Sequence, residues 1–135
     1  MILTVIGIGL IGGSMAMELK QKKFCTKVIG VDSNVNHQKI ALDKKIVDEI
    51  HSLEQAIKMS DIVLISIPVD NTSKVLKEVL DLVDKQIVLD VGSIKEKVTQ
   101  HVNSHPKRKG NEVLVIFQKT DQNHRDTFQR KMMTI

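Results

Sequence analysis

Three glycines near the N-terminus, Gly7, Gly9 and Gly12, have the spacing G-x-G-x-x-G directly between a strand-like run and a helix-like run. In a dinucleotide site, the first glycine permits a tight turn, and the second lets the backbone approach a pyrophosphate. The third lets the helix pack closely against the strand. The free N–H groups of the helix's first turn then face the phosphates. The spacing therefore predicts a site for a dinucleotide.

An acidic residue completes this pattern, because Asp32 ends the next strand-like run, 20 residues after Gly12. A carboxylate there accepts hydrogen bonds from the 2′-OH of an adenosine ribose and would repel a 2′-phosphate. The neighbouring Ser33 and Asn34 supply no arginine to bind such a phosphate. We therefore expect NAD as cofactor in preference to NADP. Two alternatives stay open: a glycine motif can arise by coincidence, and an aspartate at a strand end is often only a turn former.

A second segment of the expected site, Ser66 to Pro68, lies at the end of a continuous apolar run at 61–67. Pro68 would end that strand and place the segment at the carboxyl edge of the sheet, where ligands of such folds bind. An ordinary strand-ending turn is an equally good interpretation of these residues. The cofactor-binding residues that we expect are Gly7, Ile8, Gly9, Leu10, Ile11, Gly12, Asp32, Ser66, Ile67 and Pro68.

The elements that must position these residues alternate along the chain. Strands are expected within 2–7, 27–32, 61–67 and 86–92, with a short strand or turn within 46–50. Helices are expected within 10–23, 34–45, 52–59, 69–85 and 93–104. Ser52 and Gln55 have the spacing of a capping box, and Asp70 or Asn71 is expected to cap the fourth helix. Uniformly apolar strands that alternate with helices are typical of a parallel sheet covered on both faces. The predicted fold class is doubly wound α/β, Rossmann-type, in a single domain.

Charge and composition exclude several other classes of protein. The net charge of +4 comes from the part after residue 104, where seven lysines and arginines face three acids, whereas residues 1–104 are balanced. With three aromatic residues in all, the main body offers no platform for nucleic acid. No apolar run is long enough to span a membrane. The single cysteine, Cys25, expected to be half-buried, cannot form an internal disulfide, which fits a cytoplasmic protein.

Four segments together carry a family resemblance: VIGIGLIGGSMAMELK, VIGVDSN, SDIVLISIPVD and IVLDVGSIKEKV. They resemble the N-terminal, NAD-binding domain of prephenate dehydrogenases, enzymes of tyrosine biosynthesis, and the resemblance ends near residue 109. It implies oxidative decarboxylation of prephenate to 4-hydroxyphenylpyruvate, with hydride passing to NAD. It also implies that Ser93 hydrogen-bonds near the nicotinamide and the reacting hydroxyl. From the residues alone, Ser93 would be the N-cap of the helix that follows, and both roles can coexist.

The chain departs from this family after residue 109. The family's catalytic histidine lies in a His-Pro-x-x-Gly segment after a later strand, and 110–135 contains no such segment. His105 precedes the expected strand and is interpreted as part of a turn, and His124 as solvated. The remaining histidines, His37, His51 and His101, are assigned to polar helix faces or turns, without metal-ligand spacing, so no metal is expected.

Two interpretations of the whole chain follow. Residues 1–109 are expected to form the NAD-binding domain and 110–135 a divergent basic tail with at most one strand and one helix. In the first interpretation the chain is a prephenate dehydrogenase cofactor domain, inactive alone, that lacks the family's C-terminal helical domain and therefore its homodimer. In the second it is a noncatalytic NAD-binding sensor or interaction module. A tail that adds a sixth strand to the sheet would favour the first.

Overall fold

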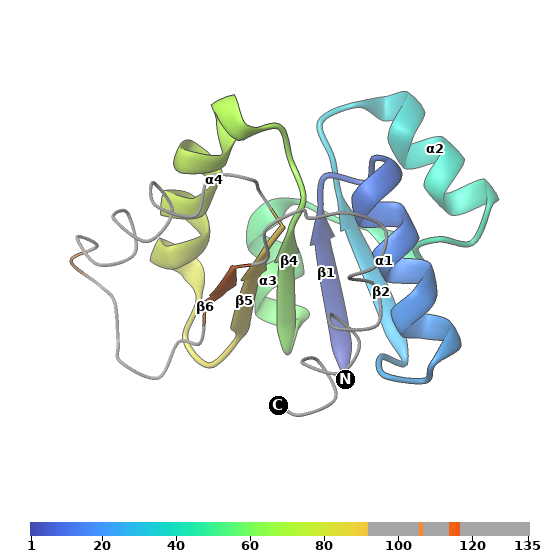
Figure 1. Ribbon diagram of the computed structural model, residues 1–135, viewed down its shortest axis with the longest axis horizontal. Helices are drawn as coiled ribbons and strands as arrows, with labels where there is room; N and C mark the ends of the chain where they lie inside the picture. Colours follow the sequence, from blue (N-terminus) through green and yellow to red (C-terminus); the bar gives the residue numbers. More distant parts are fainter. Residues whose placement is uncertain (92–105, 107–113, 117–135) are drawn as a thin grey trace.

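The computed structural model describes residues 1–91, Pro106 and 114–116, and shows a parallel sheet covered by helices on both faces (Figure 1). The strands are β1 (Ile2–Ile6), β2 (Lys27–Val31), β3 (Glu49–Ile50), β4 (Ile62–Ile65), β5 (Ile87–Asp90) and β6 (Leu114–Ile116). The helices are α1 (Leu10–Gln21), α2 (Val35–Asp43), α3 (Leu53–Met59) and α4 (Val69–Leu82). The predicted alternation of strands and helices is confirmed as far as β5, whereas the helix expected within 93–104 lies outside the described residues.

The strands lie in the order β3-β2-β1-β4-β5-β6, and each neighbouring pair is parallel. The chain starts at β1, builds outward to β3, and then crosses back to β4 on the other side of β1. The order therefore reverses between β1 and β4, and ligands of doubly wound sheets bind at the carboxyl ends of the strands at such a point. The predicted Rossmann-type class is confirmed.

Two apolar clusters form the core, one on each face of the sheet. Alternate residues of β1 belong to opposite clusters: Leu3 and Val5 pack on one face and Ile6 on the other. The first cluster includes Ala16 and Leu19 of α1 and Ala41 of α2, and the second includes Ile57 of α3 and Leu76, Val79 and Leu80 of α4. Each pair of helices thus covers its own face.

Cys25 belongs to the first cluster and is 3% exposed, more deeply buried than the half-buried position expected for it. Burial raises the pKa of its thiol above the ordinary value, and the charges of the N-terminus and Lys20 only partly oppose this. A thiol in this environment stays protonated and packs as a small apolar group.

Helix starts are predicted well in one case and wrongly in another. Ser52 caps α3 as expected, because its side chain accepts a hydrogen bond from the Gln55 N–H. The prediction that Asp70 or Asn71 caps α4 is wrong, since the helix starts at Val69 with Pro68 as the N-cap residue. The Pro68 carbonyl accepts the Asn71 N–H at 3.1 Å. Pro68 has φ −55° and an extended ψ of 143°, and its ring restricts the turn from which the helix starts.

Candidate dinucleotide-binding site

The glycine loop, which we define as residues 7–12, lies where the strand order reverses, between the carboxyl ends of β1 and β4. Gly7 follows β1 with φ +88°, a left-handed conformation that strains other residues. A Cβ on Gly7 would overlap the Ser66 carbonyl of the loop after β4, and the Ser66 N–H donates to the Ile6 carbonyl at 2.8 Å. The loops after β1 and β4 therefore touch, and only glycine fits between them.

The other two glycines of the motif differ sharply in their surroundings. A Cβ on Gly12 would overlap the Gly7 carbonyl and lie 3.1 Å from Val5 Cγ1, so this residue sets how closely α1 packs on β1. A Cβ on Gly9 would meet no atom within 4 Å. Gly12 is thus required by the packing of the protein itself, whereas Gly9 leaves space open at the surface.

That open space lies at the N-terminus of α1. Gly9 is the N-cap residue, makes no side-chain cap, and its carbonyl accepts the Gly13 N–H at 2.9 Å. No acidic residue occupies the first turn of α1. The N–H groups of that turn and the positive end of the helix dipole therefore favour an anion beside Gly9. Leu10 is 87% exposed and Ile11 43% exposed at the same end.

Asp32 follows β2 directly and is hydrogen-bonded to the glycine loop. Its Oδ2 accepts the Ile8 N–H at 2.9 Å, and its Oδ1 accepts the Asn34 N–H at 2.8 Å. The His37 ring of α2 lies 3.3 Å from Oδ2 through Nδ1. The carboxylate side chain is only 10% exposed. Within the described residues, no lysine or arginine forms an ion pair with it.

The arrangement of Asp32 differs from the expected one in two ways. Ile8 and Asp32 are both predicted to contact the cofactor, and the structure adds a hydrogen bond between them and places the Ile8 side chain in the core. Sequence reasoning also missed His37, whose contact runs across the turn between β2 and α2. The signal was present: with Asn34 as N-cap, a residue three positions later points back toward the strand end.

The expected site residues after β4 lie at the same edge of the sheet. Ser66 and Ile67 are partly buried, and Pro68 is exposed. Ile67 packs against the second core cluster, and a Cβ on Gly7 would also overlap its side chain. This segment therefore forms one wall beside the glycine loop. The predicted catalytic residue Ser93, as well as His105 and His124, lies outside the described residues.

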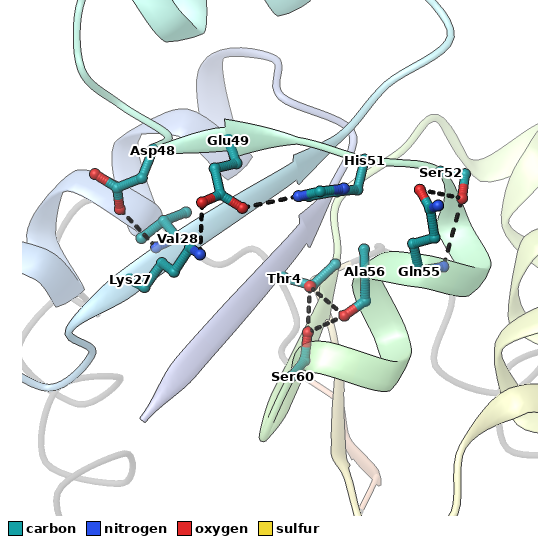
Figure 2. A network of polar contacts seen from close by, with 10 residues as sticks. All are labelled: Thr4, Lys27, Val28, Asp48, Glu49, His51, Ser52, Gln55, Ala56 and Ser60. Atoms are coloured by element: carbon teal, nitrogen blue, oxygen red, sulfur yellow. Dashed lines mark hydrogen bonds and ion pairs between the residues drawn. The ribbon is translucent and has the colours of Figure 1, made fainter.

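Polar contacts away from the glycine loop connect Lys27, Glu49 and His51, and others connect α3 to β1 (Figure 2). His51, which follows β3, contacts Glu49 at 2.8 Å, and Glu49 pairs with Lys27 at 2.6 Å. The hydrogen bond from Lys27, followed by that from His51, lowers the pKa of the Glu49 carboxyl. Nearby, the Thr4 and Ser60 hydroxyls contact each other and the Ala56 carbonyl, which fastens α3 to β1.

These groups are satisfied by one another and hold elements together. The described residues contain no group of three histidine, cysteine or acidic side chains that could hold a metal ion. None of the helices in that part of the chain has the length and apolar character needed to cross a membrane.

Residues 15–115 match the family model described as "Prephenate dehydrogenase, nucleotide-binding domain". The match begins just after the glycine loop and ends within β6. The chain is 30% identical over 101 residues to the prephenate dehydrogenase of Lactococcus lactis subsp. cremoris (strain MG1363), covering 73% of this chain and 28% of that protein. It is 31% identical over 100 residues to that of Bacillus subtilis (strain 168), covering 72% and 27%. The chain thus spans just over a quarter of these relatives' length.

Solved structures show the same similarity. Prephenate dehydrogenase from A. aeolicus, in complex with hydroxyphenyl propionate and NAD+, superposes with a TM-score of 0.73 and 26% identity, over 90% of this chain and 43% of that one. Synechocystis arogenate dehydrogenase superposes with a TM-score of 0.65 and 26% identity, over 75% of this chain and 37% of that one.

Proposed function

The chain belongs to the prephenate dehydrogenase family, in its nucleotide-binding domain, and from this membership we propose that it binds NAD for the oxidation of prephenate. One observation supports the proposal more than any other. Gly9 leaves open space beside the N-terminus of α1, at the reversal point of the sheet, while Gly7 and Gly12 are packed against protein atoms. Of these three glycines, only Gly9 thus leaves room for a group from outside the protein.

The residues around this space suit the two parts of a dinucleotide. The N–H groups of the first turn of α1 would bind the pyrophosphate. A carboxylate has about four acceptor positions, and Ile8, Asn34 and His37 use three of those on Asp32. A ribose hydroxyl can take the position left on Oδ1. Since no lysine or arginine pairs with Asp32 in the described part of the chain, a 2′-phosphate would meet uncompensated negative charge.

Bound NAD would accept the hydride, while the protein orients the substrate and takes the hydroxyl proton. The proposed reaction is oxidative decarboxylation of prephenate, and Ser93 is proposed, by resemblance, as a hydrogen-bonding partner of the reacting hydroxyl. The pairing of β6 with β5 supports this proposal over a noncatalytic sensor, because it continues the family's sheet into 110–135. A polypeptide of residues 1–135 is expected not to turn over prephenate, since its matched segment covers only 28% and 27% of the length of these two relatives.

The binding proposal is tested by calorimetric titration of the purified chain with NAD and NADP. Tighter binding of NAD is the expected result. Equal affinities would contradict the role given to Asp32, and binding of neither would contradict the proposal as a whole. For turnover, the chain is incubated with NAD and prephenate and NADH absorbance is followed. Steady NADH formation that disappears in Ser93→Ala would mean that residues 1–135 already contain a working catalytic site.

A further inference from the structure

We propose that His37 is a specificity-determining residue of the dinucleotide site, which reads the 2′ position of the adenosine ribose together with Asp32. This inference rests on the proposed NAD binding. The His37 Nδ1 lies 3.3 Å from Asp32 Oδ2, and the ring is 48% exposed whereas the carboxylate is 10% exposed. The group at the ribose end of the site is therefore an Asp–His pair in which the histidine is the more accessible partner.

The start of α2 places the ring at this position. The Asn34 side chain accepts the N–H groups of Asn36 at 2.9 Å and His37 at 3.2 Å, so His37 occupies the third position of the helix. Side chains in a helix lean toward its N-terminus, which here adjoins the end of β2. The Gln38 side chain also donates to the Asp32 carbonyl at 2.5 Å. Two consecutive residues of α2 thus hold Asp32 in place.

The direction of the His37 hydrogen bond follows from the chemistry of its partner. An ionised carboxylate only accepts, so Nδ1 carries the proton when the ring contacts Asp32. Oδ2 is then shared by the His37 ring and the Ile8 N–H. Oδ1, which accepts only the Asn34 N–H among the described residues, stays available to a ribose hydroxyl. His37 in this way helps to fix which carboxylate oxygen faces the cofactor.

The charge of the ring determines how strongly the pair rejects a 2′-phosphate. A neutral imidazole leaves the full negative charge of Asp32, whereas an imidazolium offsets it and attracts the phosphate. Histidine changes charge between about pH 5 and pH 8. The strands that contact α2 carry Lys27 and Glu49, but these pair with each other at 2.6 Å. Because an imidazolium would offset the charge of Asp32 and attract the 2′-phosphate, discrimination against NADP should weaken as the pH falls.

The test is calorimetric titration of the whole chain with NAD and with NADP, at about pH 6 and about pH 8. The variants are His37→Gln, which keeps a donor but cannot become charged, and His37→Ala, which keeps neither property. His51→Gln is the matched control, since His51, which follows β3, also contacts a carboxylate, but that of Glu49 and not that of Asp32. The 2′-phosphate also gains a proton in this range, and His37→Gln measures that contribution.

In the parent chain, the preference for NAD is expected to fall about two- to fivefold more between the two pH values than in His37→Gln. His37→Ala should weaken NAD binding about two- to fivefold, with His37→Gln close to the parent. The same pH dependence in the parent and in His37→Gln would overturn this inference while leaving the proposed function intact. A parent chain that binds neither cofactor would overturn both.

Discussion

Aspartates lie both at the amino edge of the sheet, where the strands begin, and at its carboxyl edge, where they end. At both edges they accept hydrogen bonds from main-chain N–H groups, but we assign them different roles. At the amino edge, Asp61 accepts the Ile2 N–H at 2.7 Å and Asp48 accepts the Val28 N–H at 2.8 Å. At the carboxyl edge, Asp32 accepts the Ile8 N–H at 2.9 Å in the same way. Each aspartate bonds the main chain of a neighbouring strand or of the loop that follows it. The hydrogen bond alone therefore does not distinguish a structural carboxylate from one in a binding site.

The remaining partners make the distinction. Asp48 also pairs with Lys20 at 2.5 Å, so its charge is compensated within the protein. Asp32 has a histidine in place of a lysine and lies beside the open space at Gly9. A carboxylate without a permanent cation can still accept hydroxyl groups from a ligand. Between Asp48 and Asp32, the partner cation therefore separates the two roles more clearly than the hydrogen bond to the main chain does.

The largest expected effect belongs to Gly9→Val, which fills the space at the carboxyl edge without touching the core. Because a Cβ there meets no protein atom within 4 Å, the free energy of unfolding should change by less than about 0.5 kcal/mol. NAD binding should fall by more than about a hundredfold, since the side chain occupies the place of the pyrophosphate. Calorimetry measures the binding and circular dichroism the fold. A folded variant that still binds NAD would show that the loop is only a turn.

Asp32→Ala is expected to have the next largest effect, and comparing it with a substitution at the amino edge tests whether the two edges have different roles. Loss of hydrogen bonds to a charged group costs about 1.5–3 kcal/mol, so NAD affinity should fall about tenfold or more and the preference over NADP should narrow. Asp61→Ala is the matched control, since it removes an aspartate that also bonds a backbone N–H, at the amino edge. It should leave both affinities unchanged. Equal losses in the two variants would mean that Asp32 acts through the fold alone.

Gly12→Ala tests the close packing at Gly12, which contrasts with the open space at Gly9 in the same loop. Its Cβ would overlap the Gly7 carbonyl, so α1 must shift away from β1. Overpacking of this kind costs about 1–3 kcal/mol of unfolding free energy. Chemical denaturation followed by circular dichroism measures the loss, with Gly9→Ala as the control that should stay close to the parent. A Gly12→Ala chain as stable as the parent would refute the close packing that the structure shows.

Much of this arrangement could be predicted from the sequence, because it depends on local patterns. The continuous apolar run of β4 and the alternation of elements predict a parallel sheet, and the spacing of Gly7, Gly9 and Gly12 predicts their place between β1 and α1. What could not be predicted depends on contacts across the fold. The hydrogen bond from the Ile8 N–H to Asp32 joins residues 24 positions apart, and the deep burial of Cys25 results from the elements that pack around it.

The smallest effect is expected at the amino edge, from Asp48→Asn. Burial disfavours the charge of Asp48, but the Lys20 side chain, the Val28 N–H and the Lys20 and Lys27 charges outweigh it and lower the pKa of the carboxyl. An acid whose pKa is lower in the folded state stabilises the fold above its unfolded value of about 3.9, and this contribution is lost as the pH falls further. Because the side chain is 36% exposed, solvent screening limits the contribution to less than about 1 kcal/mol.

Asp48→Asn keeps an acceptor for the Val28 N–H and removes only the charge. At neutral pH the variant should therefore be less stable than the parent by a fraction of about 1 kcal/mol, and the two should converge below about pH 4. Thermal unfolding followed across that pH range measures the difference. NAD affinity should match that of the parent, because the charge of Asp48 is already compensated by Lys20 at the other edge of the sheet. A loss of NAD affinity in a variant that unfolds like the parent would mean that the two edges are coupled, and would remove the basis for treating Asp32 as the distinct carboxylate.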